Sequence, residues 1–194
     1  MNLDPRLIEI ACEGLVSFRL EDQPFAIPIS LVREINRHLE LTHVHRSPAS
    51  VRGLVNLRGQ IVTVVDFGEC LGFGPRPITE TSRLVVLKES ADLHDNLPEG
   101  IGTEDATIGL LVDRISDVLS PKAQDIEPPP PHLRAFEHPY VIAVCKTATH
   151  TVGVLNPAAL VEVTTEQTVR SLEGLPGSTP NLGSIEGKTN AQAH

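Results

Sequence analysis

The sequence has few of the residues on which disulfide-stabilised and nucleic-acid-binding proteins depend. Its 194 residues include three Cys, one Met and no Trp, with only five Phe and one Tyr. The cysteines are odd in number, widely spaced and set among apolar neighbours, which favours reduced thiols over a disulfide framework or a zinc site. So few aromatic side chains leave almost no stacking platform for single-stranded nucleic acid.

Basic clusters and long apolar runs are also missing. Sixteen Lys and Arg against 25 Asp and Glu give a net charge of -9, which argues against nucleic acid or an anionic membrane as the partner. The longest apolar run, 140–145, is far shorter than the roughly 18 residues needed to span a bilayer. The first six residues carry Asp4 where a secretory leader would be basic. We therefore expect a cytoplasmic protein that does not insert into a membrane.

Frequent Gly and Pro residues, which interrupt regular structure, and alternating apolar residues predict many short strands. The 14 Gly and 16 Pro are spread along the chain rather than gathered in one linker. Apolar and polar side chains alternate over residues 15–20 and again over 25–29. The clearest hairpin joins the apolar runs 54–57 and 60–65 through Arg58-Gly59, because the glycine tolerates the positive φ of a tight turn.

Three short helical segments are predicted from capping residues. Ser30 is a weak cap for one turn. Ser47-Pro48 is a cap followed by proline at the first helical position, with Gly53 as the left-handed residue that ends the helix. Asp66 caps a helix over 67–71 that ends at Gly72. The Gly- and Pro-rich segment 72–77 is the expected joint between two lobes.

The strand pattern occurs twice along the chain. Residues 25–35 match residues 108–118 at an offset of 83, and residues 62–66 match 152–156 at an offset of 90. Two matches in the same order indicate a duplicated unit, that is, two similar β lobes.

The two copies differ in their loops. In the second copy, residues 89–105 form a long acidic loop with no Lys or Arg, which is either a solvated excursion or a functional segment. Pro128 to Pro131 predict a rigid crossover. Residues 166–194 lose all apolar periodicity, so we expect a disordered tail.

The residues form no recognisable catalytic set. Cys145 is the nearest to a nucleophile, but its apolar neighbours favour a core thiol. His38, His43 and His45 have a spacing compatible with metal binding, yet no further strong ligand accompanies them. We therefore predict no catalytic residues, no cofactor and no metal, and a protein that works by binding other proteins. One polar pair is of interest: Glu34 and Arg58 would meet if the hairpin closes against the next strand.

At these residues the chain resembles the CheW-like domain family of bacterial chemosensory proteins. The resemblance is carried by Val-Arg-Glu-Ile at 32–35 and by residues 47–66, which include Gly53 and the Asn-Leu-Arg-Gly run 56–59. It extends more weakly through the second lobe and covers about 13–165. The resemblance implies a mainly β fold of two SH3-like five-stranded β-barrel lobes with short helices, at about 14–75 and about 81–165.

The resemblance also implies a function without enzymatic activity. Family members couple transmembrane chemoreceptors to the histidine kinase CheA. The cytoplasmic tip of a methyl-accepting chemoreceptor would enter a groove between the lobes, and the kinase's CheW-like regulatory domain would bind other faces. The residues matching the family's receptor-binding groove are Val32, Glu34, Gly53, Asn56 and Arg58.

Some positions depart from the family pattern. Thr63 stands where the family often has proline, and Phe67-Gly68-Glu69 replaces its aliphatic and basic residues. An alternative is therefore a coupling protein of a non-flagellar system, such as one controlling pilus motility. The remaining alternatives are a small β-barrel that binds nucleic acid, which the charge opposes, and an unrecognised enzyme, for which the sequence shows no reactive set.

Overall fold

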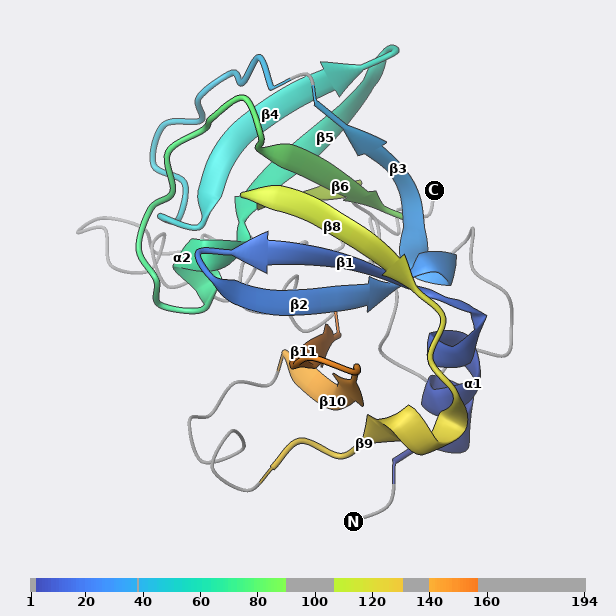
Figure 1. The fold of residues 1–194 in the computed structure, drawn as a ribbon. Coiled ribbons are helices and arrows are strands. Elements are labelled where there is room, and N and C mark those ends of the chain that lie inside the picture. Colours follow the sequence, from blue (N-terminus) through green and yellow to red (C-terminus); the bar gives the residue numbers. More distant parts are fainter. Residues whose placement is uncertain (1–2, 38, 90–106, 131–139, 157–194) are drawn as a thin grey trace, which may run out of the picture.

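The fold is mainly β, as predicted. The computed structural model describes residues 3–37, 39–89, 107–130 and 140–156 (Figure 1). Its helical elements are α1 (Pro5–Glu13), η1 (Ile29–Leu31), α2 (Phe67–Cys70) and η3 (Ala123–Asp125). Its strands are β1 (Leu15–Leu20), β2 (Gln23–Pro28), β3 (Val32–Asn36), β4 (Val51–Leu57), β5 (Gln60–Asp66), β6 (Arg83–Leu87), β7 (Ile108–Val112), β8 (Arg114–Leu119), β9 (Ile126–Glu127), β10 (Val141–Lys146) and β11 (Thr151–Leu155).

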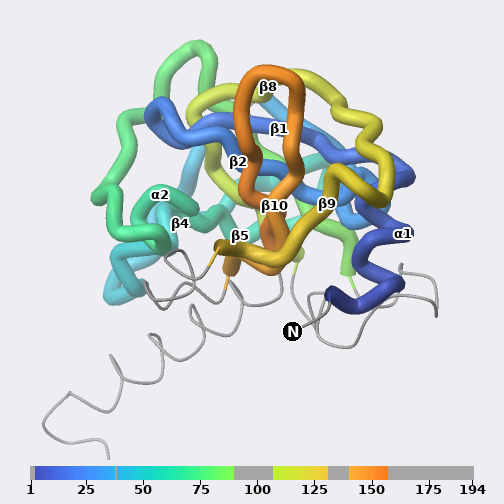
Figure 2. Tube along the Cα trace, turned by 60° about the horizontal axis from the view of Figure 1, so that its bottom comes forward, coloured from blue at the N-terminus to red at the C-terminus, as the bar shows by residue number. Residues whose placement is uncertain are grey.

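The strands form two sheets. Sheet A has the order β8-β1-β2-β11-β10-β9, and sheet B has the order β3-β6-β7-β5-β4. In Figure 1 sheet B forms the upper part of the molecule and the β1–β2 pair of sheet A crosses below it, whereas Figure 2 brings the β10–β11 hairpin forward. Most neighbours are antiparallel, but β2 pairs with β11 and β5 pairs with β7 in parallel.

The topology repeats, in agreement with the predicted duplication. Each sheet contains an antiparallel pair, a parallel contact to a second hairpin, and one edge strand beside the first pair. The copies exchange strands: β6 and β7 lie in the sheet of β3, β4 and β5, whereas β1 and β2 lie with β8, β10 and β11. The expected lobe bounds, about 14–75 and about 81–165, follow the two copies along the chain and stay a prediction, since each sheet draws on both copies.

Within the described residues neither sheet closes into a full barrel by continuous strand pairing. Strands β3 and β4 form the two edges of sheet B. The segment that connects them pairs with β4, because Thr42 and Leu54 exchange backbone hydrogen bonds of 2.7 and 2.8 Å. Sheet A has six strands rather than five because the two-residue strand β9 adds to β10. The SH3-like lobes are thus partly closed sheets.

Two hydrophobic cores hold these sheets. The larger core joins the two sheets and α1, and it gathers most of the scarce aromatic side chains: the Phe67 ring lies 6.4 Å from Phe18, 6.0 Å from Phe25 and 6.3 Å from Tyr140, measured between centroids. The smaller core belongs to sheet B and consists of Val55, Leu57, Val62, Val64, Leu84, Val86 and Leu111. The shared core fixes the two sheets as one body.

The predicted helix from Ser47 to Gly53 is wrong. The Ser47 hydroxyl donates to the Val44 carbonyl instead of capping a helix, and β4 begins at Val51. Gly53 has the expected positive φ, 143°, but uses it at a bulge where the β4–β5 register shifts between Val51 and Gly53. A cap signal and a left-handed glycine are therefore not sufficient to define a helix.

Of the two other predicted caps, the one at Asp66 is confirmed. Asp66 caps α2, since its Oδ1 accepts from the Glu69 amide at 3.2 Å, and Gly72 follows with a φ of 79°. A single 3-10 turn, η1, forms near the predicted position, but the cap at Ser30 is wrong, because Ser30 lies within the turn and the N-cap is Pro28, with no side-chain hydrogen bond. The sequence analysis did not predict α1, although Asp4 caps it and Pro5 occupies its first turn.

Several predicted segments lie outside the described residues. These are His38, residues 90–105 of the acidic loop, the end of the proline run and the tail 166–194. In the part of the chain that is described, no helix has both the length and the apolar character that crossing a bilayer requires.

Candidate functional site

The β4–β5 hairpin presents the first group of candidate residues. As predicted, Arg58 and Gly59 form its two-residue turn, and their φ angles of 54° and 92° are those of a tight hairpin turn. The Asn56 Oδ1 accepts a 2.7 Å hydrogen bond from the Gly59 amide. Because this bond spans the turn, Asn56 fixes the conformation in which Arg58 is presented.

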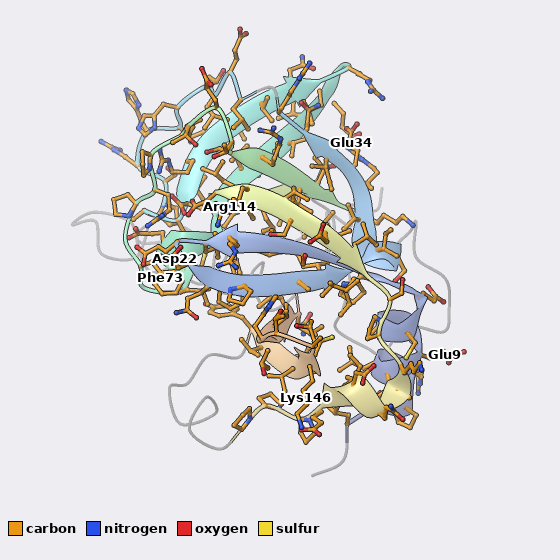
Figure 3. All side chains as sticks on the ribbon, viewed as in Figure 1. Glu9, Asp22, Glu34, Phe73, Arg114 and Lys146 are labelled. Atoms are coloured by element: carbon orange, nitrogen blue, oxygen red, sulfur yellow. The ribbon has the colours of Figure 1, made fainter. Side chains whose placement is uncertain are left out.

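Glu34 and Arg58 meet as the sequence analysis proposed. The Arg58 Nη1 lies 3.8 Å from the Glu34 Oε2, with the two side chains 87% and 26% exposed. Glu34, labelled in Figure 3, lies on β3, at the opposite edge of sheet B from β4. The ion pair therefore spans the gap between the two edges. A contact this exposed contributes only about 0 to 1 kcal/mol to folding. The pair therefore has little value for stability and leaves the guanidinium accessible to a partner.

Gly53 and Val32 have different surroundings. A Cβ at Gly53 would lie 2.5 Å from the Thr42 carbonyl oxygen, so the glycine allows β4 to approach the segment 39–42. Val32 is half-buried at the start of β3 and packs against the shared core. Of the five predicted groove residues, the structure brings Glu34, Asn56 and Arg58 to the hairpin tip and places Gly53 and Val32 in packing positions.

Two exposed isoleucines near these residues were not among the site residues predicted from the sequence. Ile35 follows Glu34 on β3 and is 43% exposed, and Ile61 lies opposite Asn56 in the β4–β5 ladder and is 55% exposed. Exposed aliphatic side chains beside charged ones are typical of protein-binding surfaces. The signal was present in the sequence, because strand alternation places Ile61 on the opposite face from the buried Val62.

A second polar cluster surrounds Asp66 at the other end of β5. The Asp66 carboxylate is fully buried. Its Oδ2 accepts from the Arg52 Nη1 at 2.9 Å and from the Arg76 amide at 3.0 Å, and its Oδ1 accepts from the Glu69 amide. The same Arg52 nitrogen also donates to the Arg76 carbonyl at 2.7 Å. The carboxylate thus fastens the backbone of the predicted joint, 72–77, to sheet B.

The Arg76 side chain continues this cluster toward sheet A. Its Nη2 and Nε donate to the two Asp113 carboxylate oxygens at 2.7 and 3.3 Å, and its Nη1 donates to the Glu21 Oε1 at 2.6 Å. The hydrogen bonds and charge of Asp113, helped by Glu21, raise the pKa of Arg76 although burial opposes this. The sequence analysis did not identify these contacts, whose partners lie far apart in the chain.

In the part of the chain that is described, both polar clusters consist of ion pairs and hydrogen bonds between side chains and backbone. Comparisons with known proteins identify the family to which this arrangement belongs. The sequence model of the family described as CheW-like domain matches residues 14–164. The chain belongs to the CheW-like family. The resemblance seen in the sequence is therefore confirmed.

Named relatives of this CheW-like chain are chemotaxis proteins. It is 32% identical over 130 residues to a chemotaxis protein CheW of Rhizobium meliloti strain 1021, covering 67% of this chain and 75% of that protein. It is 27% identical over 142 residues to the chemotaxis protein CheW of Treponema pallidum strain Nichols, covering 73% and 78%. These relatives are named as chemotaxis proteins, in agreement with the family match.

A solved structure supports the fold. The scaffolding protein TtCheW from Thermoanaerobacter tengcongensis superposes with a TM-score of 0.59 at 24% sequence identity, over 73% of this chain and 87% of that one. At this identity the likeness concerns the fold, and it confirms the mainly β, two-sheet architecture.

The thiols and imidazoles of the CheW-like chain fit a structural role. Cys145 is buried, and burial raises the pKa of its thiol. Burial, assisted by the charge of Asp66, raises the pKa of Cys70 to about 12. Both stay protonated near neutral pH and are poor nucleophiles. The His43 and His45 rings lie 5.6 Å apart, and the described residues contain no group of three or more side chains able to hold a metal.

Proposed function

We propose that this chain is a non-enzymatic adaptor that couples transmembrane chemoreceptors to a CheA-type histidine kinase in a bacterial chemosensory array. It would act in the cytoplasm, at receptor arrays held at the membrane by its partners. The membership of the CheW-like family carries this proposal. The Arg58 guanidinium supports the proposal, because it is accessible to a partner protein, lies beside Glu34 and is carried by a tight turn.

The receptor-binding side is proposed at the hairpin tip. Arg58 and Glu34 offer one charge of each sign, and the exposed Ile61, next to the turn on β5, offers apolar contact area. An amphipathic helix, the form of the cytoplasmic tip of a methyl-accepting chemoreceptor, presents the matching combination of apolar and charged side chains. Val32, Asn56 and Gly53 would support this surface by packing and by shaping the strands.

Direct binding to the kinase tests the proposal. Titration calorimetry of the full chain against the regulatory domain of the CheA-type kinase from the same organism should give a dissociation constant below about 1 mM, equivalent to about 4 kcal/mol or more of binding free energy. Heat changes indistinguishable from dilution at millimolar concentration would contradict the adaptor function. The same chain heat-denatured before titration serves as the control.

A double-mutant cycle on Glu34→Ala and Arg58→Ala tests the receptor-binding surface. Because Arg58 is 87% exposed, the two residues should couple by less than about 1 kcal/mol in unfolding free energy. In binding to a receptor cytoplasmic fragment, each single substitution should cost about 1 kcal/mol or more, a roughly fivefold or larger loss of affinity.

The matched control for that cycle is Lys146→Ala with Glu127→Ala, an exposed ion pair of 2.6 Å on sheet A. It should leave receptor affinity unchanged. If the Glu34 and Arg58 variants also bind as tightly as the unmodified chain, the receptor site lies elsewhere on the molecule.

A further inference from the structure

The linker between β5 and β6 is fastened to both sheets by one residue. The Arg76 backbone is held by sheet B, since its amide and carbonyl bond to Asp66 and Arg52. Its guanidinium binds Glu21 in the β1–β2 turn of sheet A and Asp113 at the corner where β7 of sheet B passes into β8 of sheet A. The labelled Asp22, Phe73 and Arg114, neighbours of these elements, lie at the same end of the molecule in Figure 3.

Helix α2 leaves space for the Arg76 side chain. A Cβ on Gly68 would lie 2.8 Å from the Arg76 Cγ and 3.0 Å from its Cδ. The φ of Gly68 is not in the left-handed region, so its backbone does not itself require glycine. The absent side chain at Gly68 is therefore matched to the aliphatic stem of Arg76.

The partners of Arg76 also bond to each other. Asp113 Oδ2 accepts from the Glu21 amide at 2.6 Å as well as from Arg76, so removing the guanidinium leaves two carboxylates facing each other. The Arg76 and Asp113 side chains are only 20% and 23% exposed. Arginine suits this position, because its planar fork binds Asp113 with two nitrogens while a third reaches Glu21.

We infer that Arg76 is a latch that locks the β1–β2 turn of sheet A to the β5–α2 end of sheet B, and that Gly68 is the seat of this latch. Releasing it detaches the linker from the β1–β2 turn and the β7–β8 corner, and loosens the Asp113 carboxylate that holds the Glu21 amide, without breaking any strand ladder. The latch thus restrains local motion of the linker relative to sheet A. This inference does not rest on the proposed function and is tested on the isolated chain.

The first test is a double-mutant cycle of Gly68→Ala and Arg76→Ala read by thermal unfolding. Arg76→Ala should lower the Tm by at least about 2 to 4 °C, the shift expected in a protein of this size when one charge is removed from a partly buried ion-pair cluster. Gly68→Ala should lower the Tm in the unmodified chain by displacing Arg76. In the Arg76→Ala background it should leave the Tm unchanged or raise it, because alanine favours a helix over glycine. Additive effects would overturn the pairing of seat and latch.

The second test separates a latch from simple stabilisation. Arg76→Met keeps the aliphatic stem and removes the charge, and native-state hydrogen exchange then follows the Glu21 and Arg76 amides. These amides should exchange at least tenfold faster, with unchanged protection in the β10–β11 hairpin. Equal acceleration everywhere, or no change at Glu21, would overturn the latch. Arg83→Ala is the matched control, since among the described residues Arg83 donates to the backbone carbonyls of Glu80 and Ser82, and it should leave the Glu21 amide protected.

Discussion

Replacing Asp66 by alanine is expected to lower the free energy of unfolding by about 3 to 5 kcal/mol, the cost of removing one member of a buried ion pair. The carboxylate is fully buried and accepts from the Arg52 side chain and from the Arg76 and Glu69 amides. Its loss leaves the Arg76 and Glu69 amides without this acceptor and removes the counter-charge of the partly buried Arg52 guanidinium, which is the most costly of the three losses. Since small domains are stable by only about 5 to 15 kcal/mol, this substitution removes a large share of the total.

Chemical denaturation monitored by circular dichroism measures this loss. Asp66→Asn keeps the shape and one acceptor oxygen, but it removes the charge and replaces the other oxygen by a donor, so its stability should fall between those of the unmodified chain and Asp66→Ala. Asp22→Ala removes an exposed acid of the same type and should change stability by no more than about 0.5 kcal/mol. A loss of less than about 1 kcal/mol for Asp66→Ala would mean that water replaces the carboxylate, and that the cluster does not organise this end of the molecule.

Substituting Gly53 by alanine should cost about 2 to 4 kcal/mol, because two penalties combine. The φ of 143° disfavours any residue with a Cβ, and that Cβ would meet the Thr42 carbonyl oxygen at 2.5 Å. The obstacle is backbone held by the two hydrogen bonds between Thr42 and Leu54, so it does not move aside as a flexible side chain would. The expected outcome is a lower Tm with binding to a receptor fragment reduced only as far as the protein unfolds.

Gly74→Ala isolates one of the two penalties. Gly74 also has a positive φ, 81°, but its Cβ would meet nothing within 4 Å, so this variant should lose only about 1 kcal/mol. If Gly53→Ala and Gly74→Ala lose equal stability, the contact with Thr42 carries no cost. If Gly53→Ala keeps its Tm and loses receptor binding, Gly53 acts in the receptor groove, as the family resemblance suggests, rather than in packing.

Local features were predicted well because their physical causes are local. The Arg58-Gly59 turn and the Asp66 cap depend on residues at most three apart, and both are present. The helix from Ser47 failed for the opposite reason: whether a positive φ at Gly53 ends a helix or makes a bulge depends on Thr42, which lies across the sheet. A local signal is sufficient only where no distant strand competes for the same backbone.

Long-range features needed the structure. Alternation identified strands such as β2 but did not show that its parallel neighbour is β11. Arg76 could be placed in the joint between the copies, yet its partners Asp113 and Glu21 lie 37 and 55 residues away. Nothing in the spacing of charges along the chain distinguishes these acids from others, so the second polar cluster was not predictable. The Glu34–Arg58 contact was predictable because Arg58 lies at the tip of a recognisable hairpin and Glu34 on the strand against which that hairpin was expected to close.

The exchange of strands between the two copies has a consequence for the order in which the protein takes shape during synthesis. β1 and β2 leave the ribosome early, but β8 and β11, their neighbours in sheet A, are made last, and β5 must wait for β7. A nascent chain that has reached the linker holds two hairpins and no complete sheet. Their apolar faces stay uncovered until the second copy emerges, so the sheets are completed only then and depend on contacts between distant residues, which form slowly.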